Sequence, residues 1–143
     1  MLILGDLVLA LTLGSASLSA SSQNGTMASA SSKAQGAPFD LLVAETERAP
    51  TKSYLSVPGF HERTAPGARW LMCAYTALAV ERGFSYWYVV YPAPTSSRVV
   101  VGLSNLANAS PAEVLGPDYV KEHAVGEGMM PVERMATFCG IKR

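Results

Sequence analysis

The clearest pattern of apolar and polar positions along the chain lies between residues 69 and 91. Residues 69–82 repeat apolar side chains at helical spacing, and Gly83 follows at the position where helices commonly end in the left-handed conformation. On a helical wheel, one half of this segment is mostly apolar and holds Trp70, Leu71, Cys73, Ala74, Ala77, Leu78 and Val80. The other half holds Tyr75, Thr76, Ala79 and Arg82. We therefore predict a helix over 69–82 that turns its apolar half, Cys73 included, toward the core.

Glu81 is the charge that falls on the apolar half of this predicted helix. Two interpretations follow from its position. Glu81 either reaches solvent through the last turn of the helix or is a buried catalytic carboxylate. The pattern favours the solvent-exposed position, because the helix ends at the next residue but one.

Aromatic and β-branched residues dominate the segments that follow. Residues 84–91 read FSYWYVVY, which predicts a strand covered on both faces. Residues 98–103 read RVVVGL and predict a second strand, and the short connection favours an antiparallel pair. Residues 54–57 predict an earlier strand, and the proline and glycine content of 60–68 predicts a loop.

Two shorter helical signals lie toward the C-terminus. Ser110 and Glu113 form a capping-box pattern around Pro111, and residues 130–139 precede Gly140. Together the segments predict an α+β fold. A small, mostly antiparallel sheet packs against one main helix at about 69–82, with short helical segments at the C-terminal end.

The N-terminal third differs in composition from the rest. Residues 7–13 form an apolar run that is too short to cross a bilayer, and small residues follow it, so residues 1–20 are predicted to be a signal peptide. Asp6 and the lack of Lys or Arg before the run are untypical of one, and a buried N-terminal helix is the alternative. Residues 21–50 are predicted to be a flexible Ser/Ala-rich linker and 51–143 a small α+β domain.

The chain has two cysteines, Cys73 and Cys139. An even pair in an exported protein predicts a disulfide bond, although two separate buried thiols would also fit. Residues 1–72 contain no cysteine, so we expect no lipid anchor on an N-terminal cysteine. The predicted location is extracytoplasmic, periplasmic or secreted after signal cleavage. Tethering through an uncleaved N-terminus is the alternative.

Charge and motifs exclude several functional classes. Lys and Arg together number 11, as do Asp and Glu, and no basic stripe is present, so nucleic-acid binding is not expected. No phosphate-binding, dinucleotide-binding, zinc-protease or serine-hydrolase motif occurs, and we expect no metal site, cofactor or catalytic residue. His61 and His123 each stand next to a glutamate, and adjacent side chains do not point together.

A helix ending in Arg-Gly, followed by an aromatic strand and preceded by a short strand, resembles a group of small uncharacterised bacterial envelope proteins, many of them lipoproteins. The resemblance covers residues 54–91. The matching residues are Ala77, Leu78, Glu81, Arg82, Gly83, Phe84, Tyr86, Val89 and Val90. The lipid-bearing cysteine of that group is absent here. The resemblance implies a cell-envelope location and this fold, and it implies no catalytic residue.

The function expected from the sequence is therefore that of a non-catalytic, exported cell-envelope protein that binds an unidentified envelope partner or acts as a structural accessory. The alternative is a small secreted hydrolase that depends on Cys73 or Cys139 as a thiol and on one of the histidines.

Overall fold

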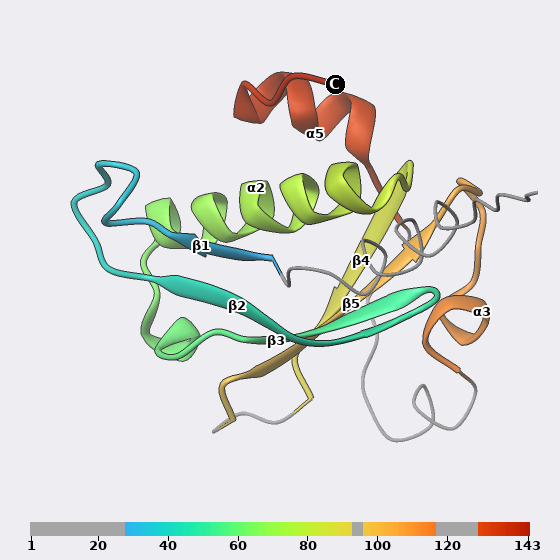
Figure 1. The fold of residues 1–143 in the computed structure, drawn as a ribbon, viewed down its shortest axis with the longest axis horizontal. Helices are drawn as coiled ribbons and strands as arrows, with labels where there is room; N and C mark the ends of the chain where they lie inside the picture. Colours follow the sequence, from blue (N-terminus) through green and yellow to red (C-terminus); the bar gives the residue numbers. More distant parts are fainter. Residues whose placement is uncertain (1–27, 93–95, 117–128) are drawn as a thin grey trace, which may run out of the picture.

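A computed structural model describes residues 28–92, 96–116 and 129–143 and shows a curled antiparallel sheet with helices packed against it (Figure 1). The sheet has six strands in the order β1-β2-β3-β5-β4-β6. The strands are β1 (Ser29–Ser31), β2 (Leu42–Ala49), β3 (Lys52–Ser56), β4 (Tyr86–Val90), β5 (Arg98–Ser104) and β6 (Met130–Pro131). The helices are η1 (Phe60–Glu62), α2 (Ala65–Arg82), α3 (Pro111–Leu115) and α5 (Val132–Cys139). The predicted α+β class is confirmed.

The main helix, α2, begins four residues before the predicted start. Thr64 is its N-cap, and the Thr64 hydroxyl oxygen accepts a hydrogen bond from the Gly67 N–H at 3.3 Å. Pro66 lies in the first turn, where its missing N–H costs nothing, so residues expected to form a loop belong to the helix. The helix ends as predicted at Gly83, which has φ 80°.

The prediction of which face of α2 is buried was only partly right: Leu71 and Leu78 are buried as predicted, but the core-facing side also takes in residues of the other half. The buried residues of the helix are Gly67, Leu71, Tyr75, Thr76, Leu78 and Ala79. Tyr75 and Thr76 can face the core because their hydroxyl groups find partners there. The Trp87 Nε1–H donates to the Thr76 hydroxyl at 2.9 Å, and the hydroxyl groups of Tyr75 and Tyr91 lie 3.2 Å apart.

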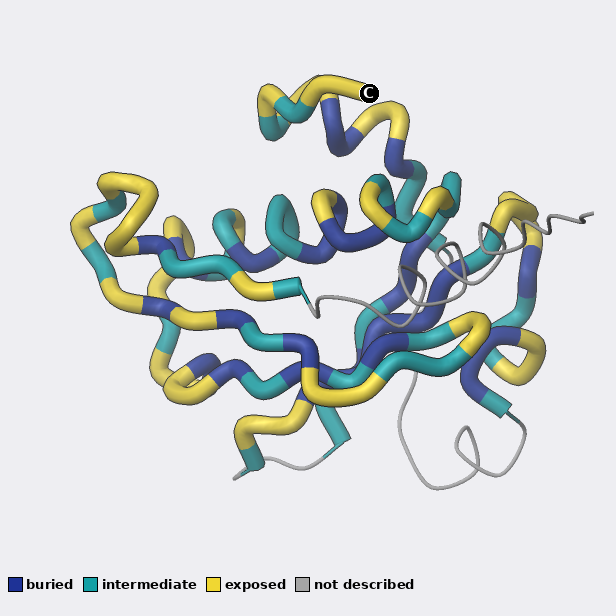
Figure 2. The backbone as a smooth tube through the Cα atoms, in the orientation of Figure 1, coloured by how far each residue is buried: buried dark blue, intermediate teal, exposed yellow. Residues whose placement is uncertain are grey.

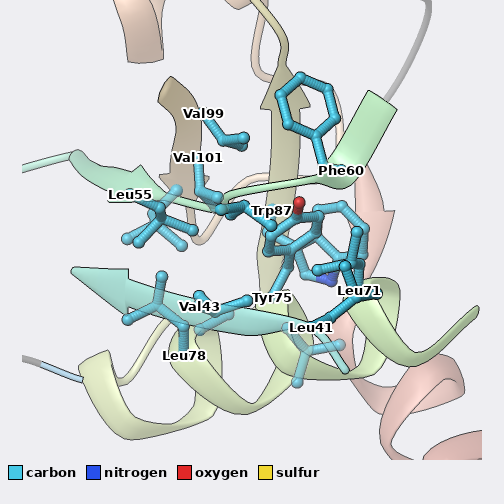
Figure 3. Close-up of a cluster of buried hydrophobic side chains, with 14 residues drawn as sticks. Leu41, Val43, Leu55, Phe60, Leu71, Tyr75, Leu78, Trp87, Val99 and Val101 are labelled. Atoms are coloured by element: carbon cyan, nitrogen blue, oxygen red, sulfur yellow. The ribbon is translucent and has the colours of Figure 1, made fainter. Parts of the chain in front are cut away.

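Two apolar clusters lie on the two faces of the sheet. The larger lies between the sheet and α2 and includes Leu41, Val43, Leu55, Phe60, Leu71, Tyr75, Leu78, Trp87, Val99 and Val101 (Figure 3). The smaller contains Tyr88, Val90 and Val100 with two side chains of α3. Trp87 and Tyr88 point to opposite faces and are both buried, which confirms the prediction of a strand covered on both sides.

The order of the layers places α5 on the outer side of α2 (Figure 1). Its buried residues are Val132, Met135 and Ala136. Figure 2 shows that buried segments concentrate where α2 meets the sheet, while much of α5 is exposed. No helix in the described ranges has both the length and the hydropathy needed to cross a membrane.

The prediction of a flexible linker over residues 21–50 was wrong for the described residues 28–50, which form β1, the turn after it and β2. Leu41 and Val43 are buried in the core. Ser32 is fully buried, and its hydroxyl donates to the Phe39 carbonyl at 2.8 Å and accepts from the Leu41 N–H at 2.7 Å. The Ser/Ala-rich composition that suggested a linker therefore also suits a close-packed edge of the sheet. Residues 1–27, including the predicted signal peptide, lie outside the described part.

Candidate binding groove

A disulfide bond joins Cys73 of α2 to Cys139 of α5, with the two Cα atoms 5.6 Å apart. The bond confirms the predicted pair and fits an oxidising, extracytoplasmic environment. Both cysteines are half-buried and lie where α5 covers the outer side of α2. Cys73 therefore does not face the sheet-side core, as the helical wheel had suggested, but the second helix layer.

An open groove of about 770 Å³ lies next to this disulfide bond. β1 forms one side, α2 forms another, and the end of α5 with the residues after it closes the groove, which reaches the core side chains of Val43, Leu55 and Leu78. Its walls are mostly apolar and are formed by Ala28, Ser29, Ala30, Gln35, Val43, Leu55, Pro66, Arg69, Trp70, Cys73, Ala74, Ala77, Leu78, Glu81, Phe138, Cys139 and Ile141. Grooves of this size and lining are typical of small-molecule sites.

One end of the groove lies at the C-terminal end of α2. The Ala28 N–H, at the start of β1, donates to Glu45 Oε1 at 3.1 Å. Arg48 joins Glu45 to the helix, since its Nη2 lies 2.6 Å from Glu45 Oε1 and 3.3 Å from Glu81 Oε1. Arg48 is shared by the two carboxylates, and the nearby Arg82 supplies the second positive charge that balances them.

The other end of the groove lies in the N-terminal half of α2. The Trp70 Nε1–H donates to Gln35 Oε1 at 2.9 Å, which places the turn after β1 next to this part of the helix. β1 and α2 therefore run in opposite directions along the groove. Arg69 lines this end, is exposed, and has no hydrogen-bond or ion-pair partner within the described ranges. This end of the groove thus carries a positive charge that no described residue pairs.

A buried polar network supports the first strands at the edge of the groove. The Glu45 side chain is fully buried and accepts hydrogen bonds from Arg48 and, at 2.5 Å, from the Ser53 hydroxyl. Arg82 donates to the Ser53 hydroxyl at 3.0 Å and to the carbonyl oxygen of Ala49 at 2.6 Å.

This network decides the charge state of Glu45. Burial alone would raise the pKa of Glu45, but the hydrogen bonds from Arg48, Ser53 and the Ala28 N–H, with the positive charge of Arg48, outweigh it and lower the pKa. A carboxylate that is this fully partnered holds strands together and is not available to a substrate.

The residues proposed for a thiol- or histidine-dependent hydrolase are not brought together by the described part of the structure. Both sulfur atoms belong to the disulfide bond. His61 is exposed, and its Nε2 lies 3.0 Å from the Ser96 carbonyl oxygen, outside the groove lining. His123 lies outside the described residues. Glu81 is about half exposed, as the sequence indicated, and not a buried carboxylate.

Sequence reasoning missed the groove because it assigned the whole apolar half of α2 to the core, whereas Trp70 and Ala74 are half-buried, pack against the core and also line the groove. Trp70, Ala74 and Ala77 were predicted to be buried, and they line the groove with Ala77 exposed. The signal for this arrangement was present. α2 is apolar on nearly all sides, and one of those sides must then face something other than the sheet.

Comparisons with known proteins give no match. No family model, no curated protein and no solved structure is significantly similar to this chain. The resemblance to small envelope proteins over residues 54–91 therefore stays a prediction from the sequence.

Proposed function

We propose that this protein is an exported, non-catalytic binding protein of the cell envelope, and that the groove between β1, α2 and α5 is its ligand site. The observation that carries the proposal is the groove itself: about 770 Å³ of mostly apolar space, held open between elements that a disulfide bond fixes. A concave, mostly apolar site of this volume is typical of ligand binding.

Two further observations support this reading. The disulfide bond fits an oxidising compartment, and the apolar run at residues 7–13 is typical of an export signal that would deliver the chain to the periplasm or the exterior. The groove walls are more apolar than polar, and the one carboxylate among the described lining residues, Glu81, is paired with Arg48. Such walls suit the binding of an apolar ligand better than the chemistry of bond cleavage.

The test uses a neutral, environment-sensitive dye, N-phenyl-1-naphthylamine, and the full chain with its disulfide intact. We expect saturable binding with enhanced dye fluorescence. The variant Ala77→Phe places a ring in the groove from an exposed position of α2 and should abolish most of the signal. The matched control is Ala112→Phe, at an exposed position of α3 away from the groove, which should bind like the wild type.

Two outcomes would contradict the proposal. One is the absence of saturable dye binding by the folded wild-type protein. The other is equal binding by both variants, which would place the dye somewhere other than the groove. Circular dichroism of each variant establishes that it is folded before binding is compared.

A further inference from the structure

We infer that the ligand of this groove is a free single-chain amphiphile with an anionic head group, of the fatty-acid type, whose head lies at Arg69 and whose chain runs along α2 toward Glu81. The inference rests on the proposed function and adds to it the chemistry and the direction of the ligand.

The dimensions of the groove fit one chain. An α-helix rises about 1.5 Å per residue, so the lining stretch of α2 from Pro66 to Glu81 is about 22 Å long. One leaflet of a bilayer is about half of the roughly 30 Å hydrocarbon core, so an extended acyl chain takes about 15 Å. One chain with its head group therefore fits this length.

The walls beside the chain are mostly apolar. Ala74 and Ala77 present only methyl groups, while Phe138 and Ile141 stand on the opposite side, and Phe138 is 65% exposed. A methylene chain forms no hydrogen bonds, and its burial is favourable by about 0.8 kcal/mol of free energy per CH₂ group. A ligand rich in polar groups would leave them unpaired against these walls.

The charges set the direction and the sign of the head group. At one end, the two carboxylates of Glu45 and Glu81 are balanced by two arginines of the same network, whereas Arg69 at the other end has no partner among the described residues. Arg69 also lies near the N-terminus of α2, whose first turn carries no acidic residue, so the helix dipole adds to the positive potential there. A carboxylate is complementary to this end, and a guanidinium can bind it with two parallel hydrogen bonds.

The test compares two amphiphiles of equal chain length, dodecanoate and dodecyltrimethylammonium, below their micellar concentrations. Their affinities for the full, oxidised chain are measured by calorimetry and by displacement of N-phenyl-1-naphthylamine. We expect dodecanoate to bind at least about 10-fold more tightly than the cation. Arg69→Gln should weaken dodecanoate binding by a factor of about 3–10, and Arg69→Lys should retain most of that affinity. Arg134→Gln, which removes the same charge from an exposed position of α5 outside the groove, is the matched control.

The outcomes separate this inference from the proposed function. In one outcome, the dye binds and Ala77→Phe blocks it, but the two amphiphiles bind equally or Arg69→Gln has no more effect than Arg134→Gln. The groove is then a binding site, and the inference that its ligand is anionic is wrong. If the dye does not bind either, the proposed function fails as well. If sedimentation shows a dimer that Ala77→Phe dissociates, and dodecanoate does not bind, the occupant is a second copy of the chain and the inference is overturned.

Discussion

Removal of the disulfide bond with the double variant Cys73→Ala/Cys139→Ala should lower the free energy of unfolding by about 4 kcal/mol. The two cysteines are 66 residues apart in sequence. In the chain-entropy model, a closed loop of this length lowers the entropy of the unfolded chain by about 15 cal/mol/K, which corresponds to about 4 kcal/mol at 25 °C. The folded state should change little, because α5 is still anchored through Val132, Met135 and Ala136, all of them buried.

Urea unfolding followed by tryptophan fluorescence measures this difference, since Trp87 is in the core. For a domain of about 100 residues the same loss corresponds to a melting temperature lower by roughly 15–30 °C. The wild-type protein in excess reductant is the control and should match the double variant. A double variant within about 1 kcal/mol of the oxidised wild type would refute the reasoning, because it would show that the bond does not restrict the unfolded chain.

Three further predictions concern the core and the buried network. Because the pKa of Glu45 is lower in the folded state, ionised Glu45 stabilises the fold above its unfolded-state pKa of about 4.3, and this stabilisation is lost as the pH falls through the folded-state pKa. The free energy of unfolding in urea should therefore change less between pH 7 and pH 3 for Glu45→Gln than for the wild type. Thr76→Val leaves the Trp87 N–H without its partner and should cost about 1–3 kcal/mol in urea unfolding, whereas Thr76→Ser should recover most of it. Gly102→Ala would place a Cβ atom 3.0 Å from a side chain of α3, and this overpacking should lower the free energy of unfolding, measured by thermal unfolding, by about 1–3 kcal/mol. A variant as stable as the wild type would show that α3 can shift to make room for the added methyl group.

Local patterns in the sequence predicted the elements with strong signals. Gly83 ends α2 in the left-handed conformation, and the capping box at Ser110 begins α3 with its hydroxyl accepting from the Glu113 N–H. The strand at 84–91 and its antiparallel partner at 98–103 were predicted from β-branched and aromatic runs. The pairing of Cys73 with Cys139 was predicted because they are the two cysteines of a chain that we expected to be exported.

Features that depend on partners far apart in the sequence were not predicted. The burial of Tyr75 and Thr76 needs hydroxyl partners on Tyr91 and Trp87, and a helical wheel contains neither. The burial of Glu45 likewise depends on a network with several donors. The groove was missed for the same reason, because the helical wheel assigned the whole apolar half of α2 to the core, including residues that also line the groove.

β1 and β2 were not predicted because the Ser/Ala-rich composition of this region was given more weight than the alternation of apolar and polar positions within it. Residues 41–45 alternate buried and less buried side chains, as a strand does, but the Ser/Ala-rich stretch before them suggested a linker. The ordered sheet therefore includes residues 28–50 as well.

The most direct test of the central claim is a ¹H–¹⁵N correlation spectrum of the full, oxidised chain titrated with dodecanoate. We predict that the shifts cluster on the groove, at Ala30, Arg69, Ala74 and Ala77, and that the amides of α3 on the other face of the sheet stay unchanged. Shifts confined to α3, or no saturable shifts at all, would contradict the assignment of the groove as the ligand site.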